Sequence, residues 1–183
     1  SAAFFAFSLN TSELPGGEHL NMLLNVCFQA PVLGLTGVML EWVGRRLVTV
    51  CVFATMAMTC LALALASGRL ASQLGGYSAA LSTMGYVSAA AGFSAVYIYS
   101  SELFPTEVRS VGLSLSSQSA RLGAMASPIL VLLKDSSPVL PYAAMACMSI
   151  LAALASRSLP ETLGVPKLES SRELGDLWAS RSR

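Results

Sequence analysis

Five long stretches of the sequence contain one charged residue between them, and this feature most constrains what the chain can fold into. Each stretch is close to the ~20 apolar residues that an α-helix needs to cross a membrane. Lipid offers no hydrogen-bond partner to the backbone, so each must form a helix, and stretches this long exclude strands. The sequence therefore predicts an all-α membrane protein with spans at about 19–40, 47–67, 75–99, 111–133 and 139–156.

Composition agrees with the membrane class and argues against several other functions. Hydrophobic residues make up 54% of the chain and charged residues 11%, against about 25% charged in typical soluble domains. A net charge of +1 without a basic stripe argues against nucleic acid as a partner. The four cysteines have no paired spacing, so neither a disulfide framework nor a metal site is predicted. His19 has no nucleophile or ligand set near it, and we predict no enzyme activity and no cofactor.

The two ends of the chain differ from the middle. Residues 1–9 are apolar from Phe4 onward without a preceding positive charge, so they do not resemble a signal peptide. We interpret them as the tail of a helix whose beginning is missing, which makes the chain a fragment with six helices in residues 1–160. Residues 161–183 form a separate tail, for which a membrane-surface helix and disorder are both open.

The loops alternate between two sides of the predicted membrane. One side carries two basic residues, Arg69 and Lys134. The other carries eight: Arg45, Arg46, Arg109, Arg157, Lys167, Arg172, Arg181 and Arg183. The positive-inside rule therefore predicts that the second side and the C-terminus are cytoplasmic. We expect a multi-pass protein of the plasma membrane, with the lipid bilayer as one partner.

Two short turns on the basic side hold most of the remaining charge. The first, GVMLEWVGRRLV, has Glu41 and Arg45 at i,i+4 spacing, and Gly44 permits a tight turn before Arg46. It is interpreted either as a positive-inside anchor or as a charged latch on a neighbouring helix.

The second turn, SELFPTEVRS, gathers four candidate residues in ten positions. Pro105 disfavours helix at Phe104, so the preceding helix should end there. Its charged side chains can pair with one another or with Arg45 and Arg46. Exposed pairs contribute only ~0–1 kcal/mol each, yet a cluster that breaks and re-forms can set the balance between two states. The candidates are Glu102, Pro105, Glu107 and Arg109.

Arg121 is the charged residue inside the long stretches, near the middle of 111–133. A charge at that depth costs roughly 2.5–3.5 kcal/mol or more, and arginine does not lose its proton. The five stretches contain no carboxylate. Its partner is therefore water, an anionic substrate, or a group outside this sequence. A substrate-binding role and a purely structural pairing are both open.

The sequence YSSELFPTEVRSVGLSLSSQSARLGAMASPIL, with GRR upstream and LPETLG downstream, resembles the C-terminal half of a major facilitator superfamily transporter. More narrowly, it is similar to the organic anion, cation and zwitterion transporter family. The resemblance covers essentially the whole chain in the family's order and spacing. It implies the C-terminal six-helix bundle of a two-bundle carrier, with the first helix truncated and an N-terminal six-helix half as partner. Substrate would bind between the bundles near the midplane.

The resemblance also implies roles for individual residues. It makes Glu41, Arg45, Arg46, Glu102, Glu107 and Arg109 part of a cytoplasmic gate, with Glu161 contributing. Anion carriers of the family tend to have arginine at the position of Arg121, where several cation carriers have aspartate. Leu33 and Tyr86 stand where anion carriers often have lysine, so this half contributes one positive charge to the cavity.

Three aromatic residues complete the predicted substrate site. Tyr86, Phe93 and Tyr97 lie at i, i+7 and i+11 and share one face of a helix. Beside Arg121 they would make a slot for a flat amphiphilic ion, although rings that pack or face lipid would show the same spacing.

We therefore predict transmembrane transport of small organic ions, with organic anions favoured, by alternating access. Two alternatives stay open: a non-transporting or truncated relative that acts as a receptor-like or regulatory membrane protein, and an organic cation carrier.

Overall fold

The computed structural model describes residues 1–11, 18–68, 78–135, 137 and 139–159, and within these it contains helices and no strand. The prediction of an all-α membrane protein is confirmed. The predicted tail 161–183 and the first residues of the span 75–99 lie outside the described residues. The helices are α1 (Ala2–Thr11), α2 (Glu18–Trp42), α3 (Arg45–Gly68), α5 (Ser78–Leu103), α6 (Arg109–Leu132), the 3₁₀ turn η1 (Leu133–Asp135) and α7 (Leu140–Ser158).

Glycine and proline set several helix boundaries. Gly44 has a φ of 114°, a conformation that glycine adopts without steric cost, and it separates α2 from α3. Leu103 is the last residue of α5, in agreement with the expectation from Pro105. Pro141 lies in the first turn of α7, where a missing N–H costs nothing. Pro31 and Pro128 instead lie inside α2 and α6.

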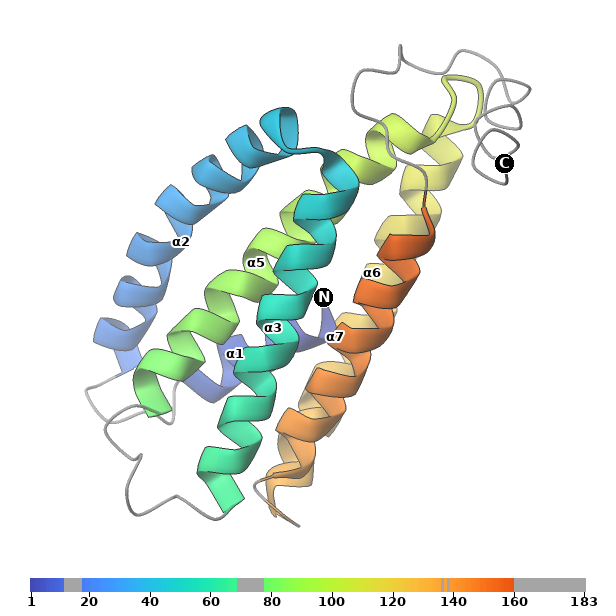
Figure 1. The fold of residues 1–183 in the computed structure, drawn as a ribbon. Helices are drawn as coiled ribbons and strands as arrows, with labels where there is room; N and C mark the ends of the chain where they lie inside the picture. Colours follow the sequence, from blue (N-terminus) through green and yellow to red (C-terminus); the bar gives the residue numbers. More distant parts are fainter. Residues whose placement is uncertain (12–17, 69–77, 136, 138, 160–183) are drawn as a thin grey trace.

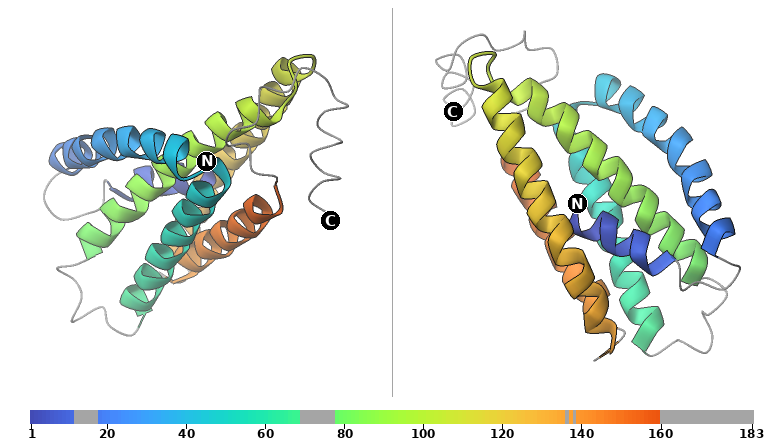
Figure 2. Two further views of the ribbon diagram at one scale, coloured as in Figure 1. Left: turned by 45° about the horizontal axis from the view of Figure 1, so that its top comes forward. Right: turned by 180° about the vertical axis from the view of Figure 1, so that it is seen from behind.

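The long helices run roughly along one direction, and the short α1 lies across them (Figure 1). α3 packs most extensively against α7 and α5, and α2 packs against α5. Seen from behind, α1 lies between α5 and α6 (Figure 2), and it contacts both. As a consequence, α1, α5 and α6 lie side by side and enclose the same part of the interior.

The main core lies where α1, α3, α5 and α7 meet. Phe7, Cys60 and Leu63 are almost completely buried there, together with Met145 of α7. Small residues allow the backbones to approach: a Cβ at Gly85 would lie 2.5 Å from Cζ of Phe7. The ring of Phe7 in α1 therefore packs directly on the Cα of Gly85 in α5.

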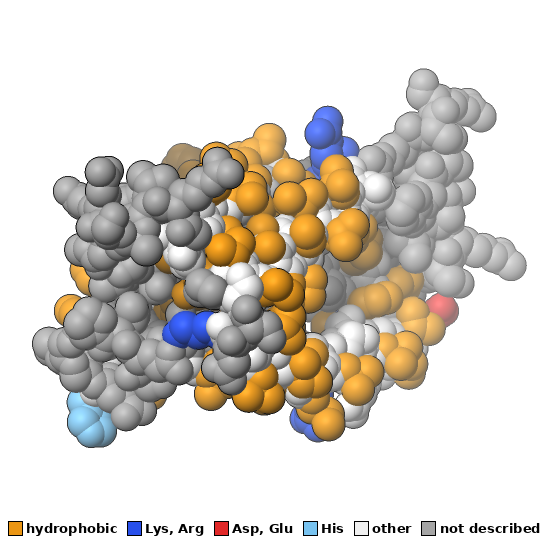
Figure 3. All heavy atoms as spheres, turned by 90° about the horizontal axis from the view of Figure 1, so that it is seen from below, with side chains coloured by type: hydrophobic (Ala, Val, Ile, Leu, Met, Phe, Trp, Pro, Cys, Tyr) orange, Lys and Arg blue, Asp and Glu red, His pale blue; other side chains and the backbone are white. Residues whose placement is uncertain are grey.

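The outer surface of the described helices is largely apolar, with few charged side chains in view (Figure 3). Four helices contain stretches that are long and apolar enough to cross a membrane: Met22–Trp42, Arg45–Ser67, Ala80–Leu103 and Leu140–Ser158. α6 is not among them, because its serines, Gln118 and Arg121 lower its hydropathy. Its polar composition distinguishes α6 from its neighbours.

We predict that Gly85→Ala destabilises the protein, because the new methyl group overlaps the buried ring of Phe7. Overpacking of this kind costs about 1–3 kcal/mol, which lowers the thermal unfolding midpoint of the detergent-solubilised, full-length gene product. Gly37→Ala is the matched control, since a Cβ there meets no atom within 4 Å. Equal midpoints for the two variants would contradict the close approach of α1 and α5.

Candidate functional site: a charged helix-end cluster and an aromatic cavity

One end of the bundle gathers the ends of α2, α5 and α7 and the starts of α3 and α6 (Figure 1, top). We call this region the charged end. Its charged residues come from turns that are far apart in the sequence: Glu41, Arg45, Arg46, Glu102, Glu107, Arg109 and Arg157. The predicted alternation of the loops therefore brings these residues to the same end of the structure.

An ion pair at the charged end joins α3 to α5. Arg45 donates from Nε to Oε2 of Glu102 at 2.8 Å and from Nη2 to Oε1 at 2.9 Å. The side chains are 17% and 26% exposed, so the pair is partly shielded from solvent. This bidentate geometry needs the two parallel N–H groups of a planar guanidinium, and a lysine could not reproduce it. The sequence predicted that these residues could pair, and the structure brings them together.

Arg46 makes a different connection, from α3 to α7. Its Nη2 donates to the backbone carbonyl of Arg157 at 2.6 Å. That carbonyl belongs to the last turn of α7, where the helix leaves carbonyl groups without intrahelical partners. A cation at this position also interacts favourably with the helix dipole. Arg45 and Arg46 thus connect the start of α3 to the ends of two other helices.

The turn between α5 and α6 is closed by Pro105 and Arg109. The Pro105 side chain is fully buried. Arg109 donates from Nε to the carbonyl of Phe104 at 3.3 Å, which ties the first residue of α6 to the end of α5. Its Nη2 atom is buried with no acceptor among the described residues.

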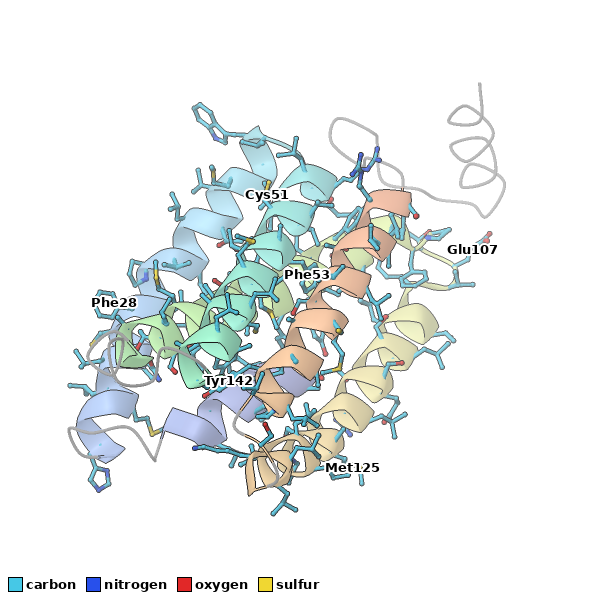
Figure 4. All side chains as sticks on the ribbon, turned by 60° about the horizontal axis from the view of Figure 1, so that its bottom comes forward. Phe28, Cys51, Phe53, Glu107, Met125 and Tyr142 are labelled. Carbon is cyan, nitrogen blue, oxygen red and sulfur yellow. The ribbon has the colours of Figure 1, made fainter. Side chains whose placement is uncertain are left out.

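Three predicted gate residues do not join this network. Glu41 and Glu107 are exposed and make no ion pair with any described residue. Glu107 lies at the edge of the bundle and points away from it (Figure 4). The i,i+4 pairing of Glu41 with Arg45 is not formed, because α2 ends at Trp42 and the turn at Gly44 places the two residues on different helices. Glu161 lies outside the described residues.

The three predicted aromatic residues form a row that is completed by a ring from α1. Phe4 stacks on Tyr86 with ring centroids 5.1 Å apart and lies 6.3 Å from Phe93 at an interplanar angle of 17°. Phe93 in turn contacts Tyr97 at 5.1 Å. The three residues therefore do share one face of α5, and Phe4 contacts both Tyr86 and Phe93, which are seven residues apart.

A cavity of about 350 Å³ lies beside this row, between α1, α3, α5 and α6. Phe93 and Tyr97 line it, Tyr86 does not, and no charged side chain does among the described residues. Phe53 points into the interior from α3 (Figure 4). The polar residues of the lining are Ser1, Tyr97, Ser100, Ser116 and Ser119. Such a space accepts an uncharged, aromatic or apolar group.

Arg121 lies in the middle of α6, 12 residues after Arg109 and 11 before Leu132. Its side chain is exposed and makes no hydrogen bond or ion pair with a described residue. Ala120 and Gly123 line the cavity, whereas Arg121 does not. The expected slot, with Arg121 beside the three rings, is therefore not assembled within the described helices. The reason is helical geometry, which turns adjacent residues about 100° apart.

Sequence reasoning missed two contributions to the cavity. Phe4 was treated only as part of an incomplete helix, and Phe53 carried no pattern that separates it from a packing residue. The serines of α6 did give a signal, since their number makes this predicted span more polar than the others. Among the described residues, no group of three His, Cys, Asp or Glu could hold a metal ion.

Comparison with known proteins gives consistent matches. The sequence profile of the family described as "Sugar (and other) transporter" matches residues 21–174. The chain is 32% identical to "Solute carrier family 22 member 15-like" of Xenopus tropicalis, over 95% of this chain and 36% of that protein. It is also 32% identical to "Organic cation/carnitine transporter 2" of Mus musculus, over 91% of this chain and 29% of that protein. The chain therefore spans about a third of the length of these relatives.

We predict that Arg45 and Glu102 stabilise the protein jointly. In a double-mutant cycle with Arg45→Gln and Glu102→Gln, thermal unfolding should reveal a coupling of roughly 1 kcal/mol, the upper part of the range for partly exposed pairs. Replacing Glu102→Gln by Glu107→Gln in the same cycle provides the control. A coupling for Glu107 as large as that for Glu102 would refute the specific contact.

Proposed function

Because the chain belongs to the sugar (and other) transporter family, and within it to the organic ion transporters of the major facilitator superfamily, we propose that it forms part of an alternating-access carrier. The carrier moves small organic ions across the plasma membrane, with organic anions as the favoured substrates. The charged end faces the cytoplasm. Family membership supports the transport of organic ions, and Arg121 is the single observation that supports the anion assignment.

Arg121 supplies the anion-binding group. It sits at the middle of a helix whose only other charged residue is Arg109 at its first position, and its guanidinium has no partner among the described residues. A permanent positive charge at this depth requires water or an anion to be stable. A carboxylate or sulfonate on the substrate meets that requirement with two hydrogen bonds. The exposed side of α6 that carries Arg121 therefore faces the aqueous pathway.

The aromatic row and its cavity bind the apolar body of the substrate. No charged side chain of the described residues lines the cavity, and Phe93 and Tyr97 are 38% and 39% exposed. Aromatic side chains contribute contact area and stacking to a flat ligand. Since Arg121 lies outside the cavity lining, charge and body are recognised by separate surfaces. Tyr86, which is covered by Phe4, positions that ring rather than contacting substrate.

The charged end acts as the gate. The Arg45–Glu102 contact joins α3 to α5, and Ser100 of the cavity lining lies two residues before Glu102. Opening the cavity toward this end requires α5 to move relative to α3, which breaks the contact. An ion pair that is partly shielded from solvent contributes enough free energy to favour the closed state of the gate over the open one, yet little enough for the gate to open.

A second candidate is a carrier of zwitterions or organic cations, and the comparisons supply its support. One similar protein carries "organic cation/carnitine transporter" in its name. In such a carrier the aromatic row would bind a cationic group through cation–π contacts, and Arg121 would bind a carboxylate on the same molecule.

Substitution of Arg121 tests the anion assignment. Hydrogen bonds to charged groups contribute about 1.5–3 kcal/mol, so Arg121→Ala and Arg121→Asp should lower the efficiency of organic-anion uptake at least about tenfold. Uptake is measured with labelled anions, cations and zwitterions in cells that express the full-length gene product at matched surface levels. Lys134→Gln removes a positive charge from η1, at the other end of α6 from the charged end, and serves as control. Unchanged anion uptake by both Arg121 variants would overturn the assignment.

Substitutions in the aromatic row test the second surface. Phe93→Ala and Tyr97→Ala should raise KM several-fold for substrates with an aromatic body, whether anionic or cationic, because about 0.5–1.5 kcal/mol of ring contact is lost. Tyr97→Phe keeps the ring and should behave like the unsubstituted protein. Phe28→Ala removes a ring that faces away from the bundle (Figure 4) and provides the control. A KM change confined to anions would show that the rings act only through Arg121.

A further inference from the structure

The turn between α5 and α6 contains a close contact that the gate described above does not use. The ring of Phe104 lies directly on the Cα of Gly112. A Cβ at Gly112 would lie 2.7 Å from Cγ and Cδ2 of Phe104 and 2.8 Å from Cδ1. Gly112 is buried and its φ is negative, as in an ordinary helix, so the position requires space and not a special backbone conformation. Any side chain at this position would have to displace the ring.

Phe104 is held in place by the first turn of α6. Its carbonyl accepts the hydrogen bond from Nε of Arg109, the first residue of that helix. The following residue, Pro105, is fully buried, and its carbonyl accepts a hydrogen bond from the backbone N–H of Val108 at 3.1 Å. The ring and the carbonyl of Phe104 therefore both contact α6, and the side chain of the following residue, Pro105, is buried.

Phe104 is also tied to the last turn of α5, because its backbone N–H donates to the carbonyl of Ser100 at 3.3 Å. Glu102 is two residues before Phe104 and belongs to the last turn of α5. Its carboxylate meets both donors of Arg45 at ordinary hydrogen-bond distances, a geometry that tolerates little displacement. If Phe104 moves, the last turn of α5 moves with it. The guanidinium of Arg109, whose Nη2 is already buried without an acceptor among the described residues, then also loses the acceptor of its Nε.

We propose that Phe104 and Gly112 are positioning residues of the gate, which act through the end of α5 on the Arg45–Glu102 contact. The bare Cα of Gly112 lets Phe104 hold the end of α5 against α6 and keeps this end of the cavity closed. A side chain at position 112 opens it. The proposal rests on the proposed carrier function only in naming the contact a gate.

The experiment measures access to the cavity rather than transport. Ser100 lines the cavity two residues before Glu102, and Ser100→Cys provides a labelling site there. The rate of reaction with a membrane-impermeant maleimide is followed in permeabilised membranes that contain the full-length gene product, with the protein without Ser100→Cys as background. Gly112→Ala should raise the rate at least about fivefold, the population shift expected from an overpacked contact. Gly34→Ala is the matched control, since a Cβ there meets nothing within 4 Å.

Phe104→Ala removes the other half of the contact and should also raise the labelling rate. The double variant Gly112→Ala/Phe104→Ala should label no faster than Phe104→Ala alone, because both changes abolish one contact. Additive effects, or a rate for Gly112→Ala equal to that for Gly34→Ala, would overturn the proposal. If Gly112→Ala does not reach the membrane, an unchanged rate for Phe104→Ala would overturn it equally. The labelling rate can be measured whether or not any substrate is transported. The positioning role of Phe104 and Gly112 and the proposed carrier function can therefore fail separately.

Discussion

The high free-energy cost of a charge in hydrocarbon is the constraint on which the rest of the structure depends. It leaves long uncharged helices, and it collects the charged residues of the described helices mainly at their ends. At the charged end the side chains are close enough to hold helices together, through the Arg45–Glu102 ion pair and the bond from Arg46 to the end of α7. The helices pack through small residues and a few buried rings. The polar contacts at the ends determine which helix ends lie together.

The interior is arranged in layers along α5. At the charged end, Glu102 contacts Arg45 and Phe104 contacts Gly112. One to two turns inward, Leu40, Val48 and Ala95 form a small buried cluster between α2, α3 and α5. Facing α1 and α6, Tyr97, Phe93 and Phe4 border the cavity. A displacement of the end of α5 therefore reaches the ion pair and the aromatic row on the same helix, which gives a physical basis for coupling the gate to the substrate cavity.

Much of this arrangement could be predicted from the sequence, because hydrophobic length, proline position and the alternation of loops act locally. The end of α5 before Pro105 is an example. The pair of Arg45 with Glu102 is one of several pairings that the sequence left open. Other features depend on how helices are rotated against one another, which spacing alone does not determine. Phe4 completes the aromatic row from a helix that the sequence left incomplete, Arg121 does not line the cavity, and Phe104 covers Gly112. The roles of Glu161 and of the tail stay predictions.

The central claim is that Arg121 occupies an aqueous pathway rather than a lipid-facing or protein-packed position. The most direct measurement is the reaction of Arg121→Cys, in the full-length gene product in intact membranes, with small charged methanethiosulfonate reagents. The account predicts rapid reaction with both reagents, because a permanent charge at this depth is stable only where water reaches it. No reaction with either reagent, while Ser100→Cys in the cavity does react, would contradict it.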